Sequence, residues 1–340
     1  MIDSQGRMTE EATDFRKSIP IICWGEKMSS NKVGSVHCER TELHHMAKAT
    51  EIATNVWTGL TADPQVKWDE AKFIRDTFDL EIHTTDTAMI PMPFVLNKAT
   101  KGLELGHQCL DFPSSGSLMP PSDDDSQVDD LVRTVRWMYT LANPGVGAAD
   151  ESTDRPRKAH KIIILCPDGY TESSFLLIAY LMYAEGLPAH DAWLKLHCGK
   201  ERNFFAYHTD VMFLRSVERR LLRESPHHER AMLLSRQPAP SWFSAMDGSL
   251  PSRITPYMYL GNLSHANNPG MLWELGIRRI LSIGEPFHWS RQDVERFGER
   301  NIMYIGQVHD NGIDSLTQEF DGCLEFIRAS FLHPFFFFFF

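Results

Sequence analysis

The chain has 340 residues, 42% of them apolar and 23% charged, which is typical of a globular protein long enough for two domains. The net charge of −11 and the lack of a dense basic cluster argue against a nucleic-acid-binding protein. The first residues are polar and acidic, unlike a signal peptide, and no apolar run reaches the ~20 residues that span a bilayer.

The cysteines and histidines give no sign of a disulfide framework or a metal site. The chain has six scattered cysteines and no CxxC pair, which favours a reducing compartment, the cytosol or the nucleus. The pairs His44–His45 and His227–His228 lack partner ligands at metal-site spacing, so we expect no metal and no cofactor.

Along the chain, residues 1–40 show little periodicity and are expected to be mobile. Residues 41–224 alternate between strand and helix patterns, which predicts an α/β domain. "NVWTG" reads as a strand entering a glycine turn, "AKFIRDTFDLEIHTT" as a helix followed by a strand, and "GHQCLDFPSSG" as a strand opening into a loop. "MPPSDDDSQVDDLVRTVRWMYTLANPG" predicts an amphipathic helix after its prolines, with acidic residues at the positive end of the helix.

The apolar run "KIIILC" predicts a strand at the centre of a mostly parallel sheet that helices flank on both sides. A short loop follows it, and "ESSFLLIAYLMYAEG" then predicts a helix that Gly186 ends. "PAHDAWLKLHCG" and "FFAYHTDVMFLRSVERRLLRES" predict two further helices. The Ser/Pro-rich residues 225–251 are expected to be a linker.

Residues 252–330 resemble a second, incomplete copy of the same unit. "YMYLG" parallels "NVWTG", and "QVHDNGIDSL" parallels "QCLDFPSSGS", which aligns Asp310 with Asp111. This copy stops before its own strand–Cys–loop–helix, so we expect its sheet to have an open interior edge. The Phe-rich residues 331–340 are interpreted as sequence outside its natural reading frame, with a buried terminal strand as the alternative.

The strand–Cys–loop–helix is the layout of a cysteine-dependent phosphate-ester hydrolase. Such an enzyme needs a thiolate to attack phosphorus, backbone N–H groups and a helix N-terminus to hold the phosphoryl oxygens, and an arginine to grip them. A mobile aspartate protonates the leaving oxygen. The corresponding loop reads H-C-x5-R-[ST].

The chain resembles the dual-specificity branch of the protein-tyrosine-phosphatase superfamily. The segments that carry the likeness are "ILCPDGYTESS", "PYMYLGNLSHA", "ELGIRRILSIGE" and "VHDNGIDSLTQEFDGCLEFI", within residues 47–328. More narrowly, it is similar to fungal dual-specificity phosphatases with two phosphatase-like domains in tandem. That resemblance implies a degenerate first domain and a catalytic second domain that is truncated here.

Residue by residue, the loop only partly matches the family. The resemblance gives Cys166 the nucleophile position, and it assigns Gly169 and Ser173 to the loop glycine and hydroxyl. Leu165 and Glu172 replace the family's histidine and arginine. In the second unit, Asp310 takes the general-acid position, and a turn-forming aspartate before Asn311–Gly312 is an equally physical account of it. The candidate phosphate loop is Cys166, Pro167, Asp168, Gly169, Tyr170, Thr171, Glu172 and Ser173.

Glu172 makes activity at this loop unfavourable. Replacing a cation by an anion beside a phosphate dianion reverses a Coulomb energy on the order of 4 kcal/mol per charge pair. Asp168 and Glu172 should also raise the pKa of the Cys166 thiol. Asp111 stands where an acid loop is expected, but without a working nucleophile it has no leaving group to protonate, so a loop or helix-capping role is favoured.

Two functions therefore compete. In the first, the chain belongs to a phosphatase that dephosphorylates phosphotyrosine and phosphoserine/threonine proteins through a cysteinyl-phosphate, and this chain lacks a complete site. In the second, it is a non-catalytic pseudophosphatase that binds or scaffolds protein partners. Neither function implies nucleic acid or a membrane as a partner.

Overall fold

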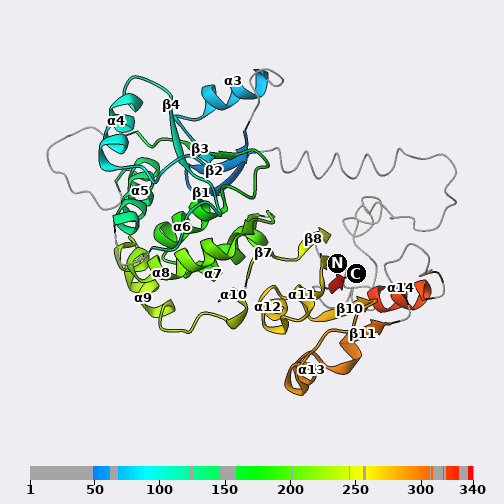
Figure 1. Ribbon diagram of the computed structural model, residues 1–340. Coiled ribbons are helices and arrows are strands. Elements are labelled where there is room, and N and C mark those ends of the chain that lie inside the picture. The colour runs from blue at the N-terminus through cyan, green and yellow to red at the C-terminus, as the bar shows by residue number, and fades with distance from the viewer. Residues whose placement is uncertain are drawn as a thin grey trace, which may run out of the picture. The chain divides into compact units, whose positions relative to one another are not determined.

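The computed structural model describes residues 49–61, 68–121, 126–145, 158–200, 202–244, 246–255, 258–306, 308, 317, 319–328 and 336–339. The predicted mobile segment 1–40 and the predicted acid Asp310 lie outside this part of the chain. The described residues form two five-stranded sheets and a small two-stranded sheet, with helices around them (Figure 1). None of the helices within these ranges is long and apolar enough to cross a bilayer.

The first sheet and its helices occupy the chain from residue 50 to residue 224. The elements are β1 (Thr50–Ala53), β2 (Val56–Leu60), α3 (Trp68–Thr77), β3 (Leu80–Thr85), α4 (Pro93–Leu103), β4 (Gln108–Pro113), α5 (Ser126–Ala142), β5 (Ile162–Cys166), α6 (Ser174–Glu185), α7 (Ala189–Leu194), the π-helix η1 (Lys195–Gly199), β6 (Phe205–Ala206) and α8 (His208–Glu224). Most of the predicted elements are present. Helix α4 was not predicted, and Gly59 lies inside strand β2 rather than in a turn.

The strand order is β1-β2-β5-β3-β4. Strand β1 pairs antiparallel with β2, and the other neighbours are parallel. The predicted mostly parallel sheet flanked by helices is therefore confirmed. Strand β5 is central and buried along its whole length, as its unbroken apolar run predicts.

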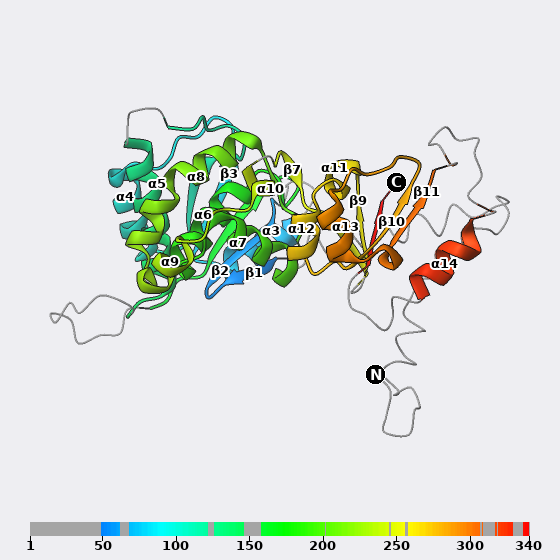
Figure 2. The same ribbon diagram turned by 90° about the horizontal axis from the view of Figure 1, so that it is seen from below.

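The two faces of β5 meet different helices. Ile162 and Ile164 belong to the large core that includes α5, α6 and α8, and Figures 1 and 2 show these helices together beside the sheet. Ile163 and Leu165 pack in a small cluster with Ile74 and Phe78 of the α3 region. Among the residues that the structure describes, the α3 face is thus covered more sparsely than the other.

Helix α6 is apolar on all sides because it runs through the core, and every residue from Ser174 to Ala184 is buried. It ends as predicted at Gly186, which has a φ of 66°. A Cβ atom there would lie 3.0 Å from the carbonyl oxygen of His227, so both the conformation and the space require glycine.

The segment predicted as a linker contains regular structure. It includes α9 (His228–Leu234), α10 (Ser241–Ser244) and β7 (Gly248–Ser249). Trp242 and Phe243 of α10 are buried and pack against Trp193. The Ser/Pro-rich segment therefore consists of short elements with buried side chains and not of an exposed linker. The predicted domain boundaries stay a prediction.

The second sheet includes β8 (Ser252–Thr255), β9 (Met258–Gly261), β10 (Arg279–Ile283), β11 (Ile302–Ile305) and β12 (Phe336–Phe339). The accompanying helices are α11 (Leu263–Ala266), α12 (Pro269–Glu274), α13 (Arg291–Phe297), the 3-10 helix η2 (Glu299–Asn301) and α14 (Phe320–Arg328). From β8 the order is β8-β9-β12-β10-β11, with only β8 and β9 antiparallel. This pattern repeats that of the first sheet.

The prediction of an open interior edge in the second sheet is wrong. Strand β12, made of four phenylalanines, pairs in parallel with β9 on one side and β10 on the other. It takes the position that β5 holds in the first sheet. Backbone N–H and C=O groups form the ladder whatever the side chains are, and phenylalanine has a high β propensity.

Candidate active-site loop

The candidate phosphate loop connects the central strand β5 to the buried helix α6. Cys166 is the last residue of β5, and Ser173 is the N-cap residue of α6. Parallel strands place their carboxyl ends at one edge of the sheet, where α/β proteins bind ligands. The structure therefore has the strand, turn and helix that the sequence predicts for this loop.

Cys166 is buried and carries its proton. Its Sγ atom lies 3.3 Å from both Oδ1 of Asp168 and Oγ of Ser173; the thiol donates its one proton to the Asp168 carboxylate, and the Ser173 hydroxyl can donate to the sulfur. Burial, reinforced by the negative charge of Asp168, raises the pKa of the Cys166 thiol to about 11. The hydrogen bond with the Ser173 hydroxyl lowers this pKa but does not offset the burial.

The Asp168 carboxylate is bound by backbone N–H groups of its own loop. Its Oδ1 atom accepts hydrogen bonds from the backbone N–H groups of Tyr170 at 3.0 Å and Thr171 at 2.8 Å. Burial raises the pKa of Asp168, but hydrogen bonds from Thr171 and Tyr170 outweigh it and the pKa is lowered overall. The loop amides are thus already occupied by an anion of the loop itself.

Glu172 cannot supply the positive charge of an arginine, and one oxygen of its carboxyl group, Oε2, is buried without a hydrogen-bond partner. Burial first, and then the charges of Asp168 and Asp86, raise the pKa of Glu172. The loop therefore holds a carboxyl group at the position where the pattern H-C-x5-R-[ST] has arginine.

A buried arginine that no sequence pattern predicts, Arg202, supports the loop. The Arg202 guanidinium donates through Nη1 to the carbonyl oxygen of Gly169 at 2.9 Å and through Nε to Oγ1 of Thr50 at 3.0 Å. Gly169 has a φ of 79°, the left-handed conformation that the tight turn needs. Arg202 lies 29 residues beyond Ser173, and no local motif marks it.

The segment after β4 packs directly on the loop. The backbone N–H of Ser115 donates to the carbonyl oxygen of Glu172 at 2.8 Å, and Ser115 Oγ accepts the backbone N–H of Phe175 at 2.8 Å. The next residue, Gly116, donates its N–H to Oδ1 of Asp210 at 2.9 Å. Ser115 thus satisfies a free N–H group in the first turn of α6.

Asp111 is not part of this contact. It is an exposed residue inside β4 and pairs with His83 of β3. The idea that it stands in an acid loop is therefore wrong, because the strand continues to Pro113 and the loop begins after it.

The sheet registers also correct the alignment of Asp111 with Asp310. In the first sheet, Gly59, Leu165, His83 and Asp111 pair across the strands on one rung. In the second, the corresponding rung is Gly261, Phe339, Ser282 and Tyr304. The glycines of "NVWTG" and "YMYLG" therefore occupy equivalent positions, as the sequence analysis suggested. Asp111 is instead equivalent to Tyr304.

Comparison with known proteins gives a partial match. No family model matches the chain. The chain is 35% identical over 151 residues to the dual-specificity protein phosphatase PPS1 of Saccharomyces cerevisiae, covering 37% of this chain and 18% of that protein. The chain thus spans about a fifth of the length of this relative.

Solved phosphatase structures overlap with about half of the chain. The crystal structure of Tk-PTP in the active form has a TM-score of 0.34 at 21% identity, covering 51% of this chain and 97% of the other. Human DUSP28 has a TM-score of 0.31 at 15% identity, with 51% and 94% covered. The human tyrosine phosphatase-like serine/threonine/tyrosine-interacting protein has a TM-score of 0.34 at 13% identity, with 52% and 99% covered.

Proposed function

We propose that the first sheet and its helices form a non-catalytic, phosphatase-like module related to the dual-specificity protein phosphatases. The similarity of 37% of this chain to the yeast enzyme supports a relationship for the chain. The observation that carries the loss of activity is the carboxylate of Asp168 on the loop amides, at 3.0 and 2.8 Å from the nitrogens of Tyr170 and Thr171.

Three features of the loop oppose phosphoryl transfer together. A phosphate dianion would have to displace the Asp168 carboxylate from the amides and would then lie among two acidic side chains. The Cys166 thiol is protonated near neutral pH, because burial raises its pKa to about 11. Glu172 provides no positive charge for the transition state.

The remaining function for such a module is protein binding. In this proposal the scaffold holds a surface that recruits a protein partner or supports a catalytic neighbour. Phosphoprotein substrates would then belong to a more complete relative with an intact loop.

The alternative is a residual phosphatase in which Arg202 takes over the role of the missing arginine. The 3.3 Å contact between the Cys166 thiol and the Ser173 hydroxyl favours it, because that contact would stabilise a thiolate. The bonds from Arg202 to Gly169 and Thr50 oppose it, because they direct donors to the protein's own oxygens.

Hydrolysis of p-nitrophenyl phosphate by the full chain separates these functions. We expect no turnover above that of the matched Cys166→Ser variant. Turnover that disappears in both Cys166→Ser and Arg202→Lys would establish the residual enzyme and refute the proposal. Tight binding of vanadate to the unmodified chain would also contradict the proposal that the Asp168 carboxylate blocks the loop amides.

A further inference from the structure

A second group of side chains capable of chemistry lies on the sparsely covered α3 face of the first sheet, away from the loop of Cys166. Glu81 of β3 and Cys109 of β4 are direct partners in the parallel ladder. His83 lies two residues after Glu81, and His107 lies two residues before Cys109. Since alternate residues of a strand point to the same face, these four side chains are gathered on one side of the sheet.

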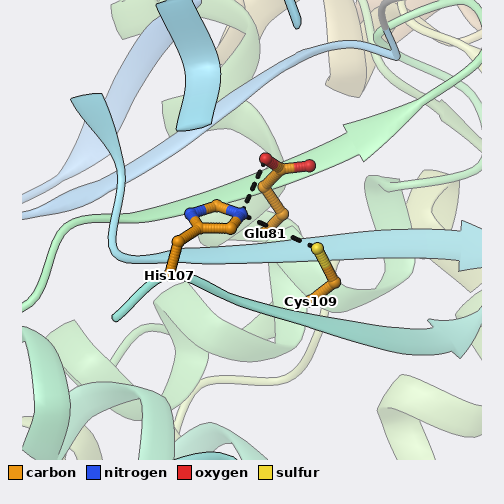
Figure 3. Close-up of side chains that lie close together, drawn as sticks. All are labelled: Glu81, His107 and Cys109. Atoms are coloured by element: carbon orange, nitrogen blue, oxygen red, sulfur yellow. Dashed lines mark hydrogen bonds and ion pairs between the residues drawn. The ribbon is translucent and has the colours of Figure 1, made fainter. Parts of the chain in front are cut away.

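Figure 3 shows three of these side chains converging. His107 Nε2 lies 2.9 Å from Glu81 Oε1 and 3.6 Å from Cys109 Sγ. One donor atom from each residue lies within 4.8 Å of the other two. A tetrahedral zinc ion with bonds of roughly 2.1 Å to nitrogen or oxygen and roughly 2.3 Å to sulfur separates its ligands by about 3.3–3.6 Å. The group therefore needs only a small adjustment to surround an ion.

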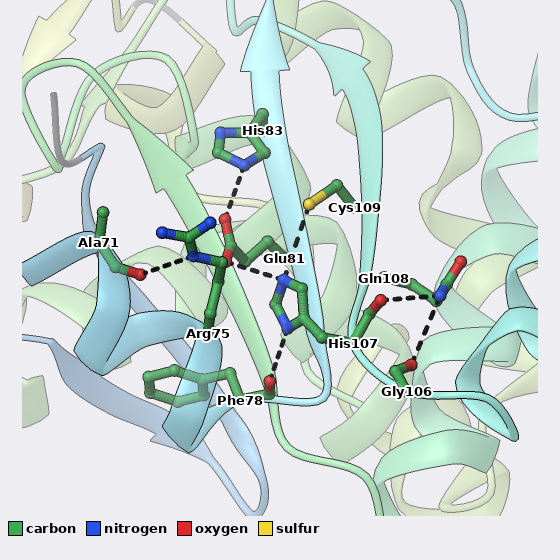
Figure 4. A network of polar contacts seen from close by, with 9 residues as sticks. All are labelled: Ala71, Arg75, Phe78, Glu81, His83, Gly106, His107, Gln108 and Cys109. Atoms are coloured by element: carbon green, nitrogen blue, oxygen red, sulfur yellow. Dashed lines mark hydrogen bonds and ion pairs between the residues drawn. The ribbon is translucent and has the colours of Figure 1, made fainter. Parts of the chain in front are cut away.

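The outer contacts of these residues are those expected around a metal ion. His107 Nδ1 lies 2.8 Å from the carbonyl oxygen of Phe78, a contact that directs the Nε2 lone pair of the neutral ring toward Glu81 and Cys109. His83 Nε2 lies 2.9 Å from Oε2 of Glu81, the oxygen that His107 does not contact. Figure 4 shows both contacts in one network.

We propose that Glu81, His107 and Cys109 bind one divalent transition-metal ion of the zinc class, with His83 positioning the carboxylate. An imidazole, a carboxylate and a thiolate form a donor set that zinc accepts, whereas magnesium and calcium prefer oxygen alone. The ligands join β3 to the edge strand β4, so the ion would clamp that edge. A fourth position remains for water.

The charges around the site are nearly balanced for a dication. A glutamate and a cysteine thiolate together neutralise its two positive charges. Arg75 lies close enough to Glu81 and Cys109 for its positive charge to disfavour binding of a cation there. The negative charge of Asp111 on β4 favours binding. Arg75 is exposed, so solvent screens its effect. The cysteine is exposed as well, which leaves a route for the ion to enter.

Titration of the full, reduced chain with Co²⁺ tests the proposal, because a thiolate ligand gives cobalt a sulfur-to-metal charge-transfer absorption. We expect this absorption to saturate at one equivalent and to disappear in Cys109→Ser. It should persist in Cys198→Ser, the matched exposed cysteine, and in Cys166→Ser. The last variant matters because Cys166, Asp168 and Glu172 form another group of close donors.

Two further variants distinguish metal binding from a simple ion-pair network. His83→Ala should weaken Zn²⁺ binding roughly 10–100-fold, and His83→Gln, which can still donate to Glu81, should restore much of it. Zn²⁺ should raise the unfolding temperature of the original chain but not that of Cys109→Ser. An absorption that survives Cys109→Ser, an absorption lost in Cys166→Ser, or no absorption at all would overturn the proposal.

Discussion

The Oδ1 atom of Asp168 lies 3.3 Å from the Sγ atom of Cys166 and accepts its proton in a hydrogen bond. A nucleophilic cysteine needs the opposite surroundings, because positive groups are what lower the pKa of a thiol. The contact with Asp168 therefore helps to keep the Cys166 thiol protonated, and the reactivity of this thiol can be measured.

Alkylation of Cys166 should be very slow. With a pKa of about 11, roughly one Cys166 in a thousand is a thiolate at pH 8, against about one in four for a free cysteine. We expect Asp168→Asn to speed the reaction with iodoacetamide several-fold, because it removes a negative charge and leaves the loop in place. Peptide mass spectrometry measures each cysteine separately. An unchanged rate for Cys166, with Asp191→Asn as the control, would show that burial alone protects the thiol.

Oxyanion binding should return in two steps. Glu172→Arg restores a cation, but Asp168 still occupies the amides, so we expect only weak vanadate or sulfate binding. The double variant Asp168→Ala/Glu172→Arg frees the N–H groups of Tyr170 and Thr171 and should bind at least about tenfold more tightly, equivalent to ~1.4 kcal/mol. Calorimetry gives both affinities. Equal affinities would mean that Asp168 does not compete with the anion.

Ser115→Ala should destabilise the fold through the first turn of α6. The variant leaves the N–H of Phe175 without its acceptor, and losing such a helix cap typically costs about 1 kcal/mol of the free energy of unfolding. Urea denaturation measures the loss. Ser235→Ala, at an exposed serine, is the matched control and should change stability by less than about 0.5 kcal/mol. Equal losses of stability in the two variants would show that Ser115 does not stabilise the first turn of α6.

Acid should destabilise the fold through His197. Burial lowers the pKa of His197 from its ordinary 6.5 to about 4. Between these two pH values the unfolded chain binds a proton at His197 that the folded chain excludes. The contribution of neutral His197 to the free energy of unfolding is therefore complete above pH 6.5 and is lost as the pH falls toward 4. The expected slope is at most about 1.4 kcal/mol per pH unit.

The comparison of His197→Leu with the original chain isolates this effect, because Asp210 titrates in the same range with the opposite sign. Burial raises the pKa of Asp210 to about 6, so its contribution falls as the pH rises from about 4 to 6. Denaturation from pH 4 to pH 7 should show a flatter acid side for His197→Leu. His208→Leu, at an exposed histidine, should retain the original slope, and a parallel profile for His197→Leu would contradict the assignment.

The fold could be predicted well wherever the pattern of apolar and polar residues is clearly that of a helix or of a strand. "KIIILC" is a buried strand because nothing polar interrupts it, and the helix after it ends at a glycine that the structure also requires. Helix α4 was missed because proline and methionine precede it and its apolar face is narrow. The likeness of the two glycine motifs predicted equivalent rungs, but the sequence spacing after them misplaced Asp111.

The candidate site could be predicted only where its residues are contiguous. The loop from Cys166 to Ser173 lies in one segment, so its acidic substitutions were visible. Arg202 and Ser115 reach it through tertiary contacts that no local pattern records. The four-residue group around Glu81 was missed for the same reason, although E-x-H and H-x-C at the starts of two neighbouring parallel strands are a usable signal.

The phenylalanine strand β12 has one more consequence. Six identical residues, 335–340, supply a strand of four, so three different four-residue frames contain the same side chains. In most sheets a slip by one residue exchanges the inner and outer faces, and the energetic penalty fixes the pairing. Here a slip leaves the chemistry of both faces unchanged. The register of β12 between β9 and β10 is therefore not specified by an alternation of its own side chains.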